Sequence, residues 1–287
     1  MSEDEKPKDD AAPRAPRPRE RDDLAAALAA PPGEIDPVAL ARRDLAKSLP
    51  RRFYAAAGAQ RTQDGFELAL DGRPARTPAR NRIVLPTLAA AEALAAEWER
   101  QSEIVDPAQM PLTRIVNSAI DGVSREVDAV AAEIARYGAS DLTCYRAAGP
   151  QALERAEAAW WDDALDFCAR ELGAQLVVTR GISFVEQPEA ARAALLAAAR
   201  AAASPQSGGV FSLAALHVMT TLTGSAVLAF AVERGAMNAA DAWTAAHVDE
   251  DYEMALWGAD DDALAARARR WREMEAAAGL IAALRAA

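Results

Sequence analysis

Histidine and cysteine are scarce in this chain, which contains two of each among 287 residues. Protein metal sites and activated nucleophiles usually depend on these residue types, so the sequence offers little material for either. Cys144 and Cys168 stand far apart and match no metal-binding spacing. We therefore expect two reduced thiols in the core of a cytoplasmic protein, and neither a disulfide nor a ligand pair.

Several nucleotide-binding and catalytic motifs are missing as well. The chain has neither a Gly-x-x-x-x-Gly-Lys-Ser/Thr loop nor a Gly-x-Gly-x-x-Gly loop, so it gives no support to a phosphate-binding site. It also lacks the Gly-x-Ser-x-Gly turn of many hydrolases, of which Ser225 after Thr223-Gly224 is only a partial imitation. We expect Gly224 to lie within a helix and to allow close helix packing.

Basic residues are fewer than acidic ones, because the chain has 32 Lys and Arg but 43 Asp and Glu, which gives a formal net charge of -11. Such a surface repels nucleic-acid phosphates and anionic membranes, so we expect neither as a partner. A basic or mixed protein surface fits better. The chain has no run of about 18 apolar residues, which predicts no membrane-spanning helix. Its acidic start, Met1 to Glu5, is unlike a secretory signal or a mitochondrial presequence.

The first 50 residues mix both signs of charge, are rich in proline and contain no aromatic residue. A stretch of this kind buries too little apolar surface to offset the entropy lost on ordering. We predict an N-terminal tail over residues 1–50 that is disordered or partly helical.

Strand signals dominate the next part of the chain. Apolar residues alternate with others over residues 66–70, and Asp71-Gly72 is a favoured two-residue hairpin turn. A short apolar run over residues 83–85 adds another strand. We expect three or four antiparallel strands, which need a cover on their apolar face.

A helix over residues 88–100 supplies that cover, and Thr87 is well suited to cap its N-terminus. Its apolar residues recur at helical spacing: Leu88, Ala91, Leu94, Ala95 and Trp98. The sequence thus predicts a small α+β domain over residues 51–123.

Helical patterns then continue nearly to the end, and their breaks coincide with glycine and proline. The expected helices cover residues 112–121, 124–137, 151–172, 189–203, 213–234, 239–257 and 261–284. We predict a larger all-helical domain over residues 124–287, and so an α+β fold class. The segments 175–178 and 182–185 favour β structure, either as a hairpin or as extended chain, and the sequence leaves these two open.

The stretch from His247 to Trp257 is the strongest candidate for a functional site. It contains Asp249, Glu250, Asp251 and Glu253, followed by Trp257 in an exposed context. On a helix, His247, Glu250 and Asp251 share one face. No Lys or Arg occurs between residues 235 and 266, so this acidic charge is locally uncompensated. The pattern fits metal binding, acid/base chemistry or a charged surface for a protein partner. His217, the other histidine, lies in an apolar stretch and is expected to be a hydrogen-bonded core residue.

Five separate stretches carry a resemblance to a known family. They are Leu70-Asp71-Gly72-Arg73-Pro74-Ala75-Arg76-Thr77-Pro78, Met110-Pro111-Leu112-Thr113-Arg114 with Asn117-Ser118-Ala119-Ile120-Asp121-Gly122, Arg136-Tyr137-Gly138, Asp141-Leu142-Thr143-Cys144-Tyr145-Arg146, and Ala245-Ala246-His247-Val248-Asp249-Glu250-Asp251-Tyr252 with Trp257-Gly258. Together they resemble the Atp-twelve (ATP12) family, the assembly chaperones of the catalytic sector of mitochondrial and alphaproteobacterial ATP synthases. The resemblance extends from about Arg51 to about Gly279, with the stretches in the family's order and near its spacing.

The resemblance implies a two-domain protein that is not an enzyme and uses no cofactor or metal. Its implied role is to hold the free alpha subunit of the synthase, as a monomer, until that subunit joins beta. The family's acidic motif maps to Asp249, Glu250 and Asp251, with Glu250 the principal residue. Trp257 beside this acidic helix fits an aromatic anchor of a transient interface, so we expect it to bind the partner as well. The composition and the lack of a presequence favour a bacterial cytoplasmic protein.

Two other hypotheses follow from the residues themselves. One is a hydrolase or metal enzyme that uses the face formed by His247, Glu250 and Asp251, although a single His-x-x-Glu lacks the paired motif of di-iron bundles. The other is a general acidic scaffold without a dedicated partner. Tightly held zinc or iron in the purified protein would favour the enzyme.

Overall fold

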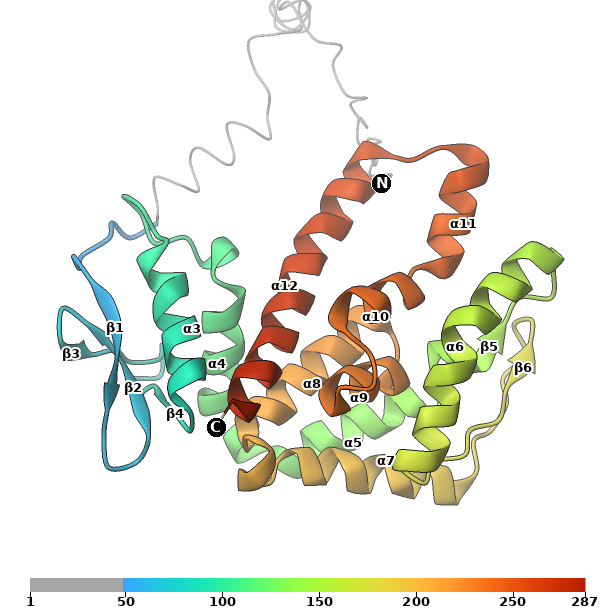
Figure 1. Cartoon of the computed structure of the whole chain (residues 1–287), viewed down its shortest axis with the longest axis horizontal. Coiled ribbons are helices and arrows are strands. Elements are labelled where there is room, and N and C mark those ends of the chain that lie inside the picture. The colour runs from blue at the N-terminus through green and yellow to red at the C-terminus, as the bar shows by residue number, and fades with distance from the viewer. Residues whose placement is uncertain (1–48, 287) are drawn as a thin grey trace, which may run out of the picture. The chain divides into compact units, whose positions relative to one another are not determined.

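The computed structural model describes residues 49–286 (Figure 1). The tail predicted over residues 1–50 lies outside the described residues except for its last two positions. The predicted boundary between residues 123 and 124 stays a prediction. No helix in the described part has both the length and the apolar character needed to cross a membrane.

A small antiparallel sheet forms first, as predicted. Its strands are β1 (Ala57–Arg61), β2 (Phe66–Leu70), β3 (Arg73–Pro74) and β4 (Val84–Leu85). Strand β2 is central because β1 pairs along its whole length, whereas β3 and β4 pair with its two ends. Asp71 (φ 49°) and Gly72 (φ 75°) both have positive φ in the turn between β2 and β3. Two such residues are typical of a type I′ hairpin turn, and the prediction of that turn is confirmed.

Helix α3 (Leu88–Glu99) covers the sheet by packing on β1 and β2. The Thr87 hydroxyl accepts the Ala90 N–H at 3.2 Å, which confirms the predicted cap. Leu94 is fully buried, as predicted for a residue that covers the sheet. Leu88 is 45 % exposed, so the prediction that it also covers the sheet is wrong. The Thr87 hydroxyl also donates to the Ala283 carbonyl at 2.8 Å, which joins the start of α3 to the last helix of the chain.

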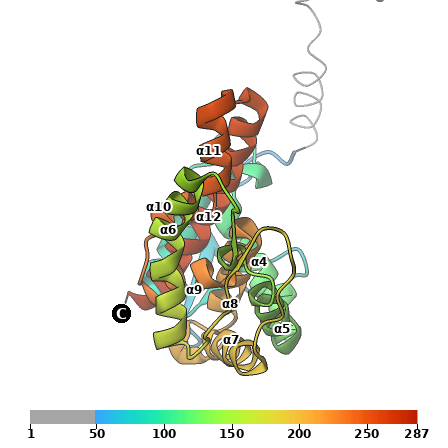
Figure 2. The same cartoon turned by 90° about the vertical axis from the view of Figure 1, so that its right-hand side faces the viewer.

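The remainder of the described chain is mostly helical, which confirms the α+β class (Figures 1 and 2). The helices are α4 (Pro111–Asp121), α5 (Val127–Gly138), α6 (Gln151–Glu171), α7 (Glu189–Ala202), α8 (Val210–Thr223), α9 (Ala226–Arg234), α10 (Ala239–Ala245), α11 (Val248–Trp257) and α12 (Asp261–Arg285). Short 3-10 turns lie at Pro107–Gln109, Val123–Arg125, Leu142–Cys144 and Pro205–Ser207. Helix α8 is largely buried and packs against α4, α5, α9 and α12.

Two predicted helices are each divided in two. The stretch 213–234 breaks at Gly224, which has φ 67° and ends α8. A Cβ on Gly224 would meet nothing within 4 Å. The interpretation of Gly224 as a site of close helix packing is therefore wrong, and its role is to adopt a left-handed conformation. The stretch 239–257 breaks at residues 246–247, between α10 and α11.

Asp141 is a fully buried carboxylate that fixes the first of these breaks. It accepts the Ser225 hydroxyl at 2.6 Å and the Val227 N–H at 3.1 Å, and it also accepts the N–H and hydroxyl of Thr143. Burial raises the pKa of Asp141, and these hydrogen bonds oppose that rise. The Ser225 side chain in turn caps α9 by accepting the Leu228 N–H. Ser225 thus has a structural role at the start of a helix.

Glu97 stabilises the start of α4 in a similar way. This buried carboxylate on α3 accepts the backbone N–H of Leu112 at 2.8 Å and that of Thr113 at 2.7 Å. The Thr113 hydroxyl donates to it at 2.6 Å. The first N–H groups of a helix have no partner within the helix, so Glu97 satisfies two of them.

Asp121 holds the loop after β3 against the end of α4. Its carboxylate accepts the Thr77 hydroxyl and the Asn81 side-chain amide, both at 2.7 Å, and the Ala79 N–H at 3.2 Å. These hydrogen bonds keep its pKa low, although partial desolvation opposes them. The sheet is therefore tied to the helical part by a polar contact as well as by packing.

A second, two-stranded sheet joins β5 (Tyr145–Arg146) to β6 (Thr179–Arg180) in parallel. The two β-prone segments near residue 180 therefore do not form a hairpin with each other. The Gln187 side chain binds both the N–H and the carbonyl of Val177, at 2.7 and 2.9 Å, and holds the chain before β6 extended.

The hairpin turn gives a direct test of the small sheet. We expect Gly72→Val to destabilise the protein by roughly 1 kcal/mol or more, because a β-branched residue resists positive φ. Gly58→Val in β1 is the matched control, since a Cβ there meets nothing within 4 Å and its φ is not positive. Urea denaturation of both variants measures the difference, and equal midpoints would show that the turn does not require glycine.

The Glu97 contact predicts a larger effect. Glu97→Leu leaves two N–H groups of α4 buried without an acceptor, and we expect a loss of about 2 kcal/mol in the free energy of unfolding. Glu92→Leu, at an exposed position on the same helix, should stay within about 0.5 kcal/mol of the wild type. Urea denaturation followed by far-UV circular dichroism checks both, and similar losses in the two variants would contradict the capping role.

Candidate functional site

Helix α11 and the first half of α12 run in opposite directions, and we name these two segments and the turn between them the arm (Figures 1 and 2). Helix α11 packs on α6, and the turn that joins it to α12 lies at the far end of the arm. Gly258, with φ 91°, ends α11. Asp260 then caps α12 by accepting the Ala263 N–H at 2.8 Å. The turn at the end of the arm is therefore set by a glycine and a capping aspartate, as local sequence rules predict.

Three large apolar side chains are exposed at the end of the arm, and we name them the tip patch. They are Leu256 (59 % exposed), Trp257 (86 %) and Leu264 (41 %). Single exposed apolar residues are ordinary, but three of them at one turn of the chain, including an almost fully exposed tryptophan, are typical of an interaction surface. The expectation that Trp257 is exposed is confirmed, whereas Leu256 and Leu264 were not predicted.

The predicted acidic residues lie along α11 and have different surroundings. Glu250 is exposed, and one of its carboxylate oxygens is 4.0 Å from Nε2 of His247. Asp251 instead turns toward α12 and forms a two-point ion pair with Arg267. The sequence-based view that this acidic charge is uncompensated is therefore wrong at Asp251, because its partner lies 16 residues further along the chain. That pair fastens the two helices of the arm together.

Asp249 lies next to Glu157 of α6. Burial raises the pKa of Glu157 to about 7, and the neighbouring Asp249 adds to the rise, while the Ala147 N–H opposes it. The neutral form of Glu157 is therefore favoured more than that of an ordinary surface glutamate. Asp249 thus belongs to the contact between α11 and α6 as well as to the surface.

His247 is buried and lies at the start of α11, one residue before its first turn. Its Nδ1 is 2.7 Å from the Trp243 carbonyl, so Nδ1 carries the proton, and its ring lies 4.1 Å from that of Trp243. Desolvation lowers the pKa of His247. The sequence predicted that His247, Glu250 and Asp251 share one helix face. Only His247 and Glu250 lie close to each other, because Asp251 points to Arg267. A neutral, packed histidine fixes the base of the arm.

Other reactive side chains are placed unfavourably for chemistry. Cys144 and Cys168 are free and buried, as predicted, and burial raises the pKa of each thiol to about 12. His217 is only half-buried, with Nε2 3.2 Å from a carboxylate oxygen of Glu133, so its assignment to the core is wrong. Among residues 49–286 no group of three or more His, Cys, Asp or Glu side chains is placed to hold a metal ion.

The base of the arm depends on residues that sequence patterns did not single out. The indole N–H of Trp161 on α6 donates to the Ala245 carbonyl at 2.7 Å, at the end of α10. Trp271 of α12 packs on Trp243, with ring centroids 5.7 Å apart. These contacts join different helices, so they have no local signal in the sequence.

Comparisons with known proteins identify the family of the chain. Residues 51–169 match the model of the family described as ATP12 chaperone protein. A crystal structure of Atp12 from Paracoccus denitrificans is 40 % identical, covering 82 % of this chain and 99 % of that one, with a TM-score of 0.75. An aspartate-to-lysine mutant of the Paracoccus denitrificans protein is 39 % identical, covering 82 % and 98 %, also with a TM-score of 0.75.

A protein from Agrobacterium tumefaciens, described as a candidate chaperone, is 40 % identical and has a TM-score of 0.77. This match covers 92 % of the present chain and 95 % of the other. Identity of this extent, over nearly the whole length of each relative and with the same fold, shows that the chain belongs to the ATP12 chaperone family.

Proposed function

We propose that this protein is a non-enzymatic chaperone that binds the free alpha subunit of the ATP synthase catalytic sector and promotes assembly of that sector. Membership of the ATP12 chaperone family supports the chaperone role. The identity of the partner is part of the proposal, as are a cytoplasmic location and a monomeric state.

The observation that carries the proposal is the combination of the tip patch with the acidic face of α11. An unassembled subunit exposes an apolar interface that aggregates unless it is covered reversibly. Interfaces that form and separate commonly use a few aromatic anchors surrounded by polar groups. Trp257 is 86 % exposed, and the exposed carboxylates of Glu253 and Glu250 lie about one and two helical turns before it on α11.

The charge of the arm also indicates the kind of surface that it binds. Within the described residues, Asp249, Glu250, Glu253 and Asp260 to Asp262 form no ion pair with Lys or Arg. A partner face that carries arginine or lysine beside apolar residues would therefore be attracted before contact. This attraction weakens as ionic strength rises.

Glu250 offers the sharpest test of the proposal. Because it is exposed, Glu250→Lys should change the melting temperature little, at a cost within about 0.5 kcal/mol. Capture of the alpha subunit, expressed without beta, should nevertheless collapse because attraction becomes repulsion worth several kcal/mol. Glu92→Lys on α3 makes the same change of charge at another exposed position and should capture the subunit normally. A stable Glu250→Lys protein with wild-type capture would contradict the role of the arm.

Trp257 is expected to supply most of the apolar contact. Trp257→Ser should keep the wild-type melting temperature, because an exposed side chain adds little to the core, yet weaken capture by about tenfold or more. Quantitative pull-down at several chaperone concentrations gives the affinity. Phe184→Ser removes another exposed aromatic side chain, 73 % exposed and outside the arm, and should leave capture unchanged. Equal losses in both variants would indicate general hydrophobic adhesion instead of a defined site.

A further inference from the structure

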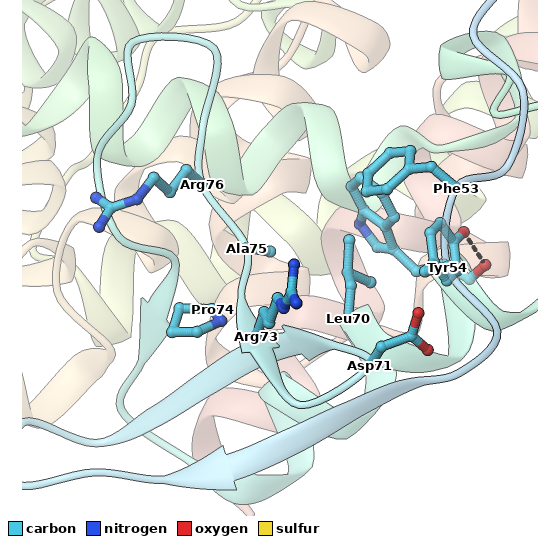
Figure 3. Close-up of a pocket in the computed structure, with 9 residues that line it drawn as sticks. Phe53, Tyr54, Leu70, Asp71, Arg73, Pro74, Ala75 and Arg76 are labelled. Carbon is cyan, nitrogen blue, oxygen red and sulfur yellow. Dashed lines mark hydrogen bonds between the residues drawn. The ribbon is translucent and has the colours of Figure 1, made fainter.

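A pocket of about 550 Å³ lies beside the small sheet (Figure 3). Phe53, Tyr54 and Trp98 provide its aromatic wall, and Leu70 of β2 contributes an apolar side chain between that wall and Arg73. Arg73 and Arg76 supply two guanidinium groups. In Figure 3, Arg76 lies on the far side of the pocket from Phe53 and Tyr54. The pocket is therefore apolar on one side and cationic on the other.

The aromatic wall is fixed by contacts within the protein. The Tyr54 hydroxyl donates to the Trp98 carbonyl at 2.7 Å, the bond drawn in Figure 3. The guanidinium of Arg52 lies 4.5 Å from the centre of the Tyr54 ring and donates to the Glu99 carboxylate at 3.0 Å. A wall that is already ordered loses little conformational entropy when a ligand binds.

The charges of the pocket are not neutralised internally. Asp71 is the carboxylate that lines it, and this group is engaged by the N–H groups of Ala55 and Ala56, both at 2.9 Å. Within residues 49–286 neither Arg73 nor Arg76 forms an ion pair, although Arg76 donates to the Arg80 carbonyl at 3.0 Å. Two arginines without carboxylate partners contrast with the net charge of -11 of the whole chain.

Two further side chains at the pocket lack the partners that such groups usually have. Phe53 lies at the edge of the pocket and is 70 % exposed, although its ring meets that of Tyr54. The indole N–H of Trp98 is buried and donates to no acceptor in the described part of the chain. Buried donors are nearly always paired, so this group is an exception beside the pocket, and its signal is a convenient reporter of binding there.

We propose that this pocket binds an acidic peptide segment of a partner protein, with an apolar side chain against Phe53 and carboxylates on Arg73 and Arg76. Guanidinium and carboxylate groups match in charge and in planar geometry. A nucleotide fits less well, because the pocket has no glycine-rich loop or helix N-terminus to hold phosphates. The proposal goes beyond the proposed function because it concerns a second surface whose charge is opposite to that of the arm.

The test uses the full chain and three blocked hexapeptides. They are Glu-Glu-Leu-Phe-Glu-Glu, its basic counterpart Lys-Lys-Leu-Phe-Lys-Lys, and Glu-Glu-Ser-Asn-Glu-Glu without apolar anchors. Fluorescence anisotropy of labelled peptides gives affinities. Nuclear magnetic resonance follows the indole N–H of Trp98, whose signal is assigned with Trp98→Phe. We expect the first peptide to bind at least tenfold more tightly than the third and to shift the Trp98 signal.

Variants locate the binding to the pocket. Arg73→Glu with Arg76→Glu should weaken the first peptide at least tenfold, and Phe53→Ser should weaken it at least fivefold. Arg155→Glu, at an exposed position on α6, should stay within twofold of the wild type. All of these side chains are exposed, so melting temperatures should hardly change.

Three results would overturn the proposal. The first is a failure of the acidic peptide to bind the wild type at millimolar concentration. The second is binding of the basic peptide that depends on Phe53 and shifts the Trp98 signal equally. The third is displacement of the acidic peptide by an equal concentration of tripolyphosphate, which would show an anion site instead of a peptide site. None of these experiments uses the alpha subunit, so they are independent of the identity of the partner bound by the arm.

Discussion

Carboxylates that accept hydrogen bonds from other segments organise much of this structure. Glu97 satisfies the start of α4, Asp121 holds the loop after β3, and Asp141 sets the start of α9. Burying a carboxylate, as at Glu97 and Asp141, is costly unless several donors reach it, and each of the three carboxylates receives at least three hydrogen bonds. Because the donors belong to specific elements, the helices must meet in one arrangement for the carboxylates to be satisfied. Apolar packing alone, in a helical part so rich in alanine, would distinguish less clearly between alternative arrangements.

These contacts also explain how far the sequence could be interpreted. Alternation, turn residues and helical spacing predicted the hairpin at Asp71-Gly72 and the cap at Thr87, because such signals act over a few residues. The sequence did not predict the break at Gly224, because the apolar pattern continues through it and the stabilising carboxylate of Asp141 lies 84 residues before Ser225. The break before α11 was missed for a similar reason. His247 is fixed by Trp243 and by helices that pack around it, and the local pattern shows only an uninterrupted helix.

The candidate site was predictable in composition but not in geometry. A run of acidic residues without nearby Lys or Arg is visible in the sequence, and so is the Trp257-Gly258 pair that follows it. The sequence cannot show that Asp251 meets Arg267 or that Asp249 meets Glu157, because both contacts join separate helices. Their consequence is that the three neighbours differ. Asp251 holds the arm together through Arg267, Asp249 lies beside Glu157, and the exposed carboxylate of Glu250 has neither kind of neighbour.

Helix α12 fixes the distance between the tip patch and the start of α3, the helix that covers the sheet. It has 25 residues, so it spans about 37 Å, and it contains no proline. One end carries Leu264 of the tip patch, and near the other end the Ala283 carbonyl accepts the Thr87 hydroxyl at the start of the helix that covers the sheet. Arg285 is also held, by Glu233 at 3.2 Å. The helix therefore acts as a rigid strut that fixes the position of Leu264 relative to the start of α3. A surface held in place in this way before a partner arrives loses little conformational entropy when it binds.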